Sequence, residues 1–321
     1  MNSELPLVSV IVTCYNHERF VVNCLESIKR QEYPELQILL SDDCSKDKSV
    51  KVIRDWMSSN PSVPITFTEN QRNQGLCRTV NEAMKLAKGK YVCPLSTDDA
   101  WEPGKILEQV MLMQTLPDRT AVVYSDAFLM AESGELLPRR FIETYRQFEH
   151  PPQGDIHHIL WEGNFIPAMT TLVRRSAFEK VGCYDENLYY EDWDMWLRIS
   201  RHFHFAYQPK RTARYRMMQS SMSKSGIDRM RVADQLMFTK HLLERQVPKK
   251  ILNKAFNYAT STAFRRRETS WVEGHRLLCT VARMYKAPRV LYSWLLYVCG
   301  FDYELYEKTL MLIKPIKRSL G

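Results

Sequence analysis

Four short apolar runs constrain the fold of this 321-residue chain more than any other feature. They occupy residues 7–12, 36–40, 65–68 and 91–95, and a segment with helical periodicity follows each. The first run is almost wholly apolar, which predicts a strand buried on both faces, as in a parallel sheet. Helices that connect parallel strands make right-handed crossovers. We therefore expect an α/β fold, with a mostly parallel sheet flanked by helices.

Polar residues follow each run, and in an open α/β sheet the carboxyl ends of parallel strands face one ligand crevice. We expect four such clusters to converge there. They are Thr13 with Tyr15, Asp42 with Asp43, Asn73 with Gly75, and Asp98 with Asp99.

The pair Asp98 and Asp99 has no neighbouring Lys or Arg to neutralise it. Two fixed carboxylates suit Mg²⁺ or Mn²⁺, which fills the rest of its shell with water and substrate phosphate. No GxGxxG follows the first run and no GxxxxGK[ST] occurs, so we expect phosphate to be held chiefly through the metal. A solvated acidic turn is the alternative.

The net charge of +8 is concentrated in residues 226–321, which carry 18 Lys and Arg against 8 Asp and Glu. A basic region of this kind suits nucleic acid, anionic lipid or an acidic substrate. Because no nucleic-acid motif accompanies it, we expect no nucleic-acid partner. Aromatic residues lie among the basic ones, as in an interfacial amphipathic helix. Peripheral membrane contact, packing on the first domain and a homodimer all remain open for this helical region.

The eight cysteines form no CxxC pair, and several lie in apolar runs. We expect reduced thiols in a cytoplasmic protein rather than disulfides or zinc.

The first residues lack a basic flank and lead at once into a strand, so we expect no signal peptide. Gly89 follows a helical segment and is expected to be its C′ glycine.

Several motifs, in their order and spacing, resemble those of the inverting family 2 glycosyltransferases, which have the GT-A fold. The resemblance covers roughly residues 6–225 and implies a GT-A catalytic domain over 1–225, followed by a helical extension over 226–321. The motifs are VSVIVTCYNHE, LLSDDCSKD, NQGL, AKGKYVxxLSTDD, GCYDExL and EDWDMWLR.

The resemblance implies roles for the clusters. Asp43 would accept a hydrogen bond from the N3–H of uracil, although a turn or helix cap before Ser45 is the alternative for Asp42 and Asp43. Asp99 would be the main metal ligand, supported by Asp98, which alternatively contacts the ribose. The remaining nucleotide-binding residues would be Thr13 and Tyr15 in the nucleotide pocket, and Asn73, Gly75 and Arg78 beside the base and ribose.

The chain also departs from the family's motifs. Ser96 stands where relatives usually have the first acid of Asp-x-Asp-Asp, and Met218 stands where a His can complete the metal site. The neighbouring Arg216 is expected to meet the diphosphate, and Ser221 and Lys224 to lie on a closing loop.

A second acidic pair, Glu191 and Asp192, precedes an expected helix. The resemblance makes Asp192 the general base that takes the proton of the acceptor hydroxyl, with Glu191 as the alternative base. Helix capping is the competing interpretation. Asp194 is expected to face away or to pair with Arg198.

These features imply a metal-dependent inverting glycosyltransferase that moves a sugar from a nucleoside-diphosphate sugar, preferably a UDP-sugar, to a glycan or lipid-linked acceptor in cell-surface polysaccharide synthesis. The alternative is a non-catalytic sugar-nucleotide or glycan-binding protein on a GT-A scaffold, which the departures at Ser96 and Met218 favour.

Overall fold

The computed structural model describes residues 5–148, 150–218, 226–242, 249–263 and 271–284, together with 293, 294 and 297. The chain divides into two compact units. The first comprises residues 1–186 and 190–219, and the second comprises residues 187–189 and 220–321. The domain boundary expected after residue 225 falls outside the described residues, as do Ser221 and Lys224 of the expected closing loop.

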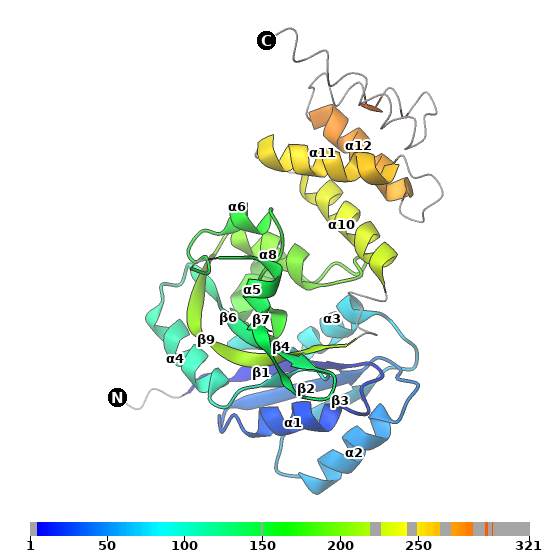
Figure 1. Ribbon diagram of the computed structural model, residues 1–321. Coiled ribbons are helices and arrows are strands. Elements are labelled where there is room, and N and C mark those ends of the chain that lie inside the picture. The colour runs from blue at the N-terminus through cyan, green and yellow to red at the C-terminus, as the bar shows by residue number, and fades with distance from the viewer. Residues whose placement is uncertain are drawn as a thin grey trace. The chain divides into compact units, whose positions relative to one another are not determined.

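The first unit is built on a nine-stranded sheet in the order β3-β2-β1-β4-β8-β6-β9-β5, with β7 paired to β6. Figure 1 shows this unit with its helices and most of its strands labelled. The four expected strands are β1 (Val8–Cys14), β2 (Leu36–Asp42), β3 (Ile65–Glu69) and β4 (Tyr91–Ser96), and they are mutually parallel. The α/β fold with a mostly parallel sheet is thus confirmed. The other strands are β5 (Ala100–Trp101), β6 (Thr120–Ala131), β7 (Leu136–Arg140), β8 (Leu172–Arg174) and β9 (His204–Met217).

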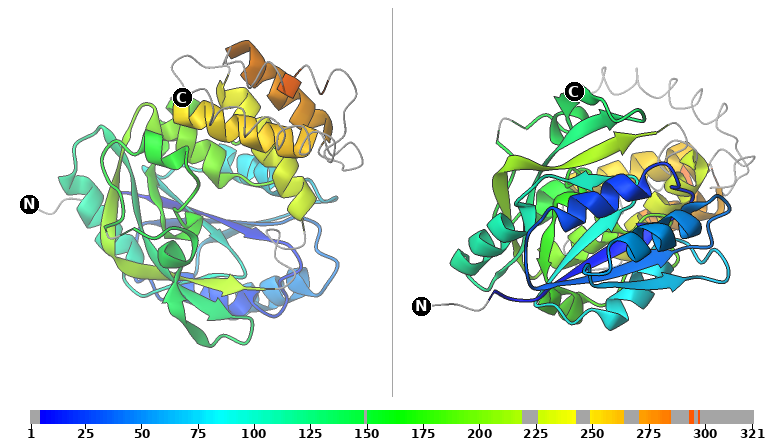
Figure 2. Two further views of the ribbon diagram at one scale, coloured as in Figure 1. Left: turned by 45° about the horizontal axis from the view of Figure 1, so that its top comes forward. Right: turned by 90° about the horizontal axis from the view of Figure 1, so that it is seen from below.

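Helices flank this sheet, and α1 and α2 lie together on one side of the parallel strands (Figure 2). In α1 the buried side chains recur at helical spacing, which gives the helix one apolar face. The helices of this unit are α1 (Val21–Lys29), α2 (Ser49–Ser59), α3 (Leu76–Leu86), α4 (Lys105–Thr115), α5 (Phe141–Tyr145), α6 (His157–Leu160), α7 (Arg175–Val181) and α8 (Asp192–Ser200), with a 3₁₀ turn η1 (Ala168–Thr170).

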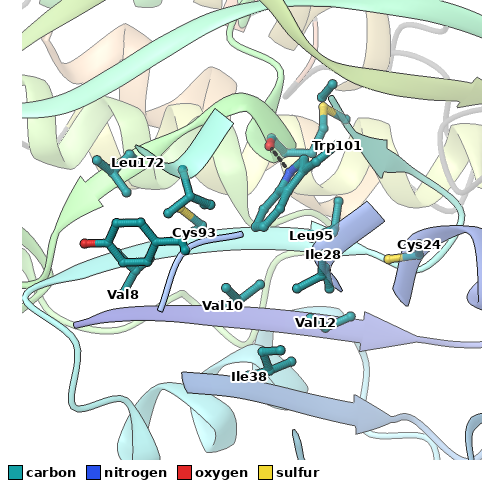
Figure 3. Close-up of a cluster of buried hydrophobic side chains, with 14 of the residues drawn as sticks. Val8, Val10, Val12, Cys24, Ile28, Ile38, Cys93, Leu95, Trp101 and Leu172 are labelled. Carbon is teal, nitrogen blue, oxygen red and sulfur yellow. Dashed lines mark hydrogen bonds between the residues drawn. The ribbon is translucent and has the colours of Figure 1, made fainter. Parts of the chain in front are cut away.

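The core lies against both faces of the parallel strands. Val8, Val10 and Val12 share one face of β1 and are fully buried (Figure 3). The intervening Ile11 is also buried and, because side chains alternate along a strand, belongs to the other face. Burying one such side chain stabilises the fold by about 1.5–3 kcal/mol. Trp101 is buried in the same cluster, and its indole Nε1 donates to the carbonyl of Met169 at 2.7 Å (Figure 3). This bond attaches the loop before β8 to the core.

The prediction for Gly89 is wrong. Helix α3 ends at Leu86, and the φ of Gly89 lies outside the left-handed region. Instead Gly89 allows two backbone segments to approach closely, because an added Cβ would lie 2.4 Å from the backbone N of Ser9 and 2.7 Å from the carbonyl O of Tyr91. Helical periodicity cannot reveal such an approach between distant segments.

We expect Gly89→Ala to destabilise the first unit by about 3 kcal/mol, because backbone atoms cannot yield to the new methyl group. Urea unfolding followed by tryptophan fluorescence measures this loss. The matched control is Lys88→Ala at the exposed neighbouring position, which should change the free energy of unfolding by less than about 0.5 kcal/mol. Equal stability of the two variants would contradict the close approach.

The described part of the second unit consists of α10 (Ile227–Leu242), α11 (Lys249–Ala263) and α12 (Trp271–Met284). These helices have buried apolar side chains of their own, including Phe238, Phe256, Leu277 and Leu278. Among the described helices, none is long and apolar enough to cross a membrane. Peripheral membrane contact and a homodimer stay predictions for this region.

Candidate active site

The carboxyl ends of the parallel strands lie at one level and bring the predicted clusters together. In the sheet register Thr13 of β1 pairs with Ser41 of β2 and with Ser96 of β4. Asp43 follows β2 and donates its backbone N–H to the carbonyl of Cys14 at 2.9 Å. The ends of β1, β2 and β4 therefore form one edge, as expected for a ligand crevice.

The loops after β1 and β2 are fastened to each other. Asn16 donates its backbone N–H to Ser45 Oγ at 2.8 Å, and its side-chain Oδ1 accepts the backbone N–H of Lys46 at 2.7 Å. His17 donates its backbone N–H to Ser49 Oγ at 2.8 Å. Tyr15 lies in the first of these loops and is 43% exposed, which leaves its ring available to a ligand.

Asp42 and Asp43 have different surroundings. Asp42 is fully buried, and its carboxylate accepts the backbone N–H and the hydroxyl of Ser45 at 2.8 and 2.5 Å. The carboxylate of Asp42, the last residue of β2, therefore closes the turn to Ser45. The Asp43 carboxylate accepts the backbone N–H groups of Gln74 and Gly75 at 2.8 and 2.9 Å and the amide of Asn70 at 3.0 Å. A carboxylate offers about four acceptor positions, so room for one further donor remains on Asp43.

The bonds to Asp43 place the segment before α3. Gly75 precedes the helix with a φ of 84°, in the left-handed region that glycine adopts without strain. Asn73 and Arg78 lie on either side of Gly75 and are exposed. The structure thus brings the start of α3 to Asp43. Contact of Asn73, Gly75 and Arg78 with a nucleotide stays a prediction.

Asp98 and Asp99 follow β4 in a tight turn, in which the backbone N–H of Asp99 donates to the carbonyl of Ser96 at 3.0 Å. The Asp99 side chain is buried, and its Oδ1 accepts the backbone N–H of Arg216 at 2.9 Å. In contrast, Oδ1 of Asp98 is buried and has no hydrogen-bond partner in the described structure. Burial and the adjacent charge of Asp98 raise the pKa of Asp99 well above its usual range.

This arrangement fits a hard divalent cation. A buried carboxylate oxygen without a partner is costly, and a cation beside it would offset that cost and the repulsion between the two acids. Within the described residues, no group of three His, Cys, Asp or Glu side chains is arranged to hold a metal. Most of the shell would therefore consist of water and substrate oxygens, as Mg²⁺ and Mn²⁺ accept.

Arg216 holds the acidic turn in place. Its Nε donates to the carbonyl of Asp98 at 2.8 Å, and its Nη1 donates to the carbonyl of Glu132 at 2.9 Å. The guanidinium also lies 4.5 Å from the ring centre of Phe20. Because the Arg216 side chain donates to backbone carbonyls, it positions the turn that carries Asp98 and Asp99.

Sequence reasoning missed His17. Its Nδ1 lies 2.9 Å from Thr97 Oγ1, and its Nε2 lies 3.8 Å from Asp98 Oδ2. The only signal in the sequence was its place directly after the polar cluster that ends β1.

The second acidic pair stands at the start of α8. Asp192 Oδ2 accepts the side-chain amide of Asn164 at 2.7 Å, and its Oδ1 accepts the backbone N–H of Trp193 at 2.7 Å. Glu191 makes no side-chain cap for the helix. Asp194 is buried and pairs with Arg198 at 2.8 Å, which confirms the expected i, i+4 pair.

The two acids have different proton affinities. Burial raises the pKa of Asp192 to about 6, and burial together with the charge of Asp192 raises the pKa of Glu191 to about 8. The two hydrogen bonds to Asp192 favour its ionised form and limit the increase. Because these hydrogen bonds favour the ionised form of Asp192, Asp192 is the acid of the two that loses its proton first as the pH rises. Two adjacent carboxyls with separated pKa values are typical of acid–base sites.

The sheet order and the helices that flank it are those of an α/β protein of the GT-A class. The model of the family described as "Glycosyl transferase family 2" matches residues 9–182, which is more than half of the chain. The chain belongs to glycosyl transferase family 2.

Two curated relatives illustrate the family. An uncharacterised glycosyltransferase of Rickettsia typhi is 28% identical over 201 residues, which cover 62% of this chain and 60% of the relative. A Bacillus subtilis glycosyltransferase assigned to teichuronic acid biosynthesis is 24% identical over 226 residues, which cover 70% of this chain and 84% of the relative. The chain thus spans about 60% of the length of the rickettsial relative.

Two solved structures share the fold. The mannosyltransferase PcManGT of Pyrobaculum calidifontis, in complex with GDP-Man and Mn²⁺, superposes with a TM-score of 0.62 at 18% identity, covering 98% of this chain and 83% of that one. Residues 1–349 of TarS from S. aureus, in complex with UDP-GlcNAc, superpose with a TM-score of 0.64 at 16% identity, covering 92% and 93% of the two chains. These similarities confirm the GT-A fold.

Proposed function

We propose that this protein is a metal-dependent inverting glycosyltransferase that moves a sugar from a UDP-sugar to a hydroxyl group of a glycan or lipid-linked acceptor. The observation that carries the proposal is Asp192, an acid at the start of α8 that two hydrogen bonds hold in place beside a second acid, Glu191. A protein that only binds sugar nucleotides has no need of a base.

Asp192 would act on the acceptor. As the acceptor oxygen attacks the anomeric carbon, the hydroxyl proton passes to Asp192 and the bond to the nucleoside diphosphate breaks. One displacement inverts the anomeric centre and forms no covalent sugar–enzyme intermediate. Glu191 is the alternative base, and it is the less suited of the two because the hydrogen bonds from Asn164 and Trp193 favour the ionised form of Asp192.

Asp98 and Asp99 would hold the divalent cation, which when bound neutralises charge on the departing diphosphate. Arg216 keeps the acidic turn in place through the carbonyl of Asp98 and the carboxylate of Asp99. This chain's own contribution is thus to fix two carboxylates at the end of β4.

The proposed preference for uracil rests on Asp43. Its remaining acceptor position suits the N3–H of uracil, and a bond to an ionised acceptor is stronger than a neutral one. The TarS complex holds UDP-GlcNAc, and the PcManGT complex holds GDP-Man. The fold therefore accepts different bases, and in this chain Asp43 is the group proposed to select uracil.

We base the proposed acceptor on the Bacillus subtilis relative, whose name assigns that protein to teichuronic acid biosynthesis. A glycan or a lipid-linked saccharide of a cell-surface polysaccharide is the corresponding acceptor class. The competing proposal, a non-catalytic binding protein, is favoured by Ser96 at the position of the family's first acid.

Calorimetry with UDP, GDP, CDP and dTDP, with and without Mn²⁺, tests the donor site. We expect UDP to bind most tightly and to depend on the metal. Tighter binding of another base would overturn the role of Asp43, and no binding of any of the four would overturn the proposed site.

We expect the activity to fall in acid, because the base must be ionised and the pKa of Asp192 is raised to about 6. Below that pH the carboxyl is protonated and cannot accept the acceptor's proton. The kcat/KM for transfer, measured from about pH 5 to 9, should therefore rise with pH and level off above the midpoint. A flat profile over that range would exclude Asp192 as the base.

A further inference from the structure

Asn164 is an uncharged residue in the loop between α6 and η1, far from Asp192 in the sequence. Its side-chain Nδ2 donates to Asp192 Oδ2 at 2.7 Å. Its Oδ1 accepts the backbone N–H of Ile166 at 3.1 Å. Both contacts require the same orientation of the amide, because a flipped amide would place its oxygen against the carboxylate. The NH₂ group of Asn164 is thus directed at Asp192 by its own loop.

Buried donors from other elements anchor η1 and Thr171, the segment that directly follows the loop of Asn164. Trp101 Nε1 donates to the carbonyl of Met169, and Gln109 Nε2 donates to the carbonyl of Thr170, at 2.7 and 2.8 Å. Lys105 is 1% exposed and reaches the carbonyl of Thr171 at 3.2 Å. These side chains belong to β5 and α4. The carboxyl end of the Asn164 loop is therefore fixed to the core by groups outside α8. Its amino end is bonded to α8 itself, because Trp193 Nε1 donates to the carbonyl of Leu160 at 2.7 Å. A loop fixed at both ends can hold an active-site group in one geometry.

We propose that Asn164 is a positioning residue for Asp192, which it holds in one orientation and keeps ionised for proton transfer. This inference rests on the proposed function, because it assigns Asn164 a role only if Asp192 is the base.

The titratable groups around Asn164 and Asp192 differ enough from Asp192 that the titration of Asp192 can be followed separately. Asp194 and Arg198 on α8 form an ion pair with each other. Burial raises the pKa of Cys77 on α3 and of Tyr184 well above their usual ranges, so both stay neutral at the pH values of an assay. Glu191 is then the neighbour that competes with Asp192 for a proton. A hydrogen bond to the ionised form of Asp192 favours ionisation of Asp192 over Glu191.

The test compares pH profiles of Asn164→Leu and wild type, with UDP release as the assay. Leu keeps the size of the side chain and removes its donor. We expect the acid midpoint of kcat/KM to rise by about one pH unit and kcat to fall about tenfold, because a hydrogen bond to a charged group is lost. The second variant, Asn164→Asp, places a like charge beside Asp192 and should raise the midpoint further.

The control is Thr171→Val, which removes a hydroxyl bond to the carbonyl of Ala168 in the same anchored segment but leaves Asp192 untouched. Its acid midpoint should match wild type.

Lower activity of Asn164→Leu with an unchanged midpoint would overturn the inference and leave the proposed function standing. If Asp192→Asn retains the wild-type activity and profile, the proposed function fails instead. If Asn164→Leu fails to fold by circular dichroism, Asn164→Asp decides.

Discussion

Asp192→Asn is expected to lower kcat about a thousandfold and to leave the affinity for UDP unchanged. A general base contributes about 10²–10⁴ to the rate, and an amide cannot take up the acceptor's proton at neutral pH. The fold should persist, because Asn keeps an oxygen that accepts the backbone N–H of Trp193. Release of UDP from the donor measures the rate, and calorimetry measures the affinity.

The matched control is the neighbouring Glu191→Gln. Because burial and the charge of Asp192 raise the pKa of Glu191 to about 8, its carboxyl is already mostly neutral at pH 7, and the neutral amide of Gln resembles that state. We expect less than about a tenfold loss. If Glu191→Gln is inactive while Asp192→Asn keeps its rate, the base is Glu191 and the assignment to Asp192 is wrong.

Asp99→Asn is expected to abolish the effect of Mn²⁺ on UDP binding and to lower kcat/KM by about a thousandfold or more. A bound metal contributes several kcal/mol to the stabilisation of a transition state that carries diphosphate charge. Asn still offers an oxygen to the backbone N–H of Arg216, so the turn after β4 should survive. Calorimetry with and without Mn²⁺ separates the metal effect from the affinity for the base.

The control for this variant is the exposed Asp55→Asn on α2, which removes one negative charge far from the acidic turn in the sequence. It should bind UDP and Mn²⁺ as wild type does. If Asp99→Asn also keeps its metal dependence, the pair Asp98 and Asp99 is not the metal site and the cation binds elsewhere.

The parallel half of the fold follows from local patterns. The apolar runs become β1, β2, β3 and β4, because a strand buried on both faces requires such a run. The remaining pairings do not follow from them. Short β8 lies antiparallel between β4 and β6, and β9 pairs in parallel with β6. Such partners are selected by packing between distant segments, which periodicity does not encode.

In the candidate site, the family motifs predicted the acidic residues but not the side chains that form hydrogen bonds with them or with their backbone. Asp43, Asp98, Asp99 and Asp192 lie in recognisable motifs. The amide that contacts Asp192 comes from Asn164 on a different loop. Similarly, Arg216 was expected at the diphosphate, yet its Nε and Nη1 contact backbone carbonyls. A single sequence does not show which distant side chains a fold brings together.

Whether this chain transfers sugars is tested most directly by proton NMR of a UDP-sugar incubated with the protein and Mn²⁺. Water replaces the acceptor hydroxyl in this assay. We predict release of UDP and of a free sugar that first appears as the β anomer from an α-linked donor, with both signals lost in Asp192→Asn. First appearance of the α anomer would contradict a single inverting displacement. Tight, metal-dependent UDP binding with no sugar release from UDP-glucose, UDP-galactose or UDP-N-acetylglucosamine would contradict the transferase and favour the binding protein.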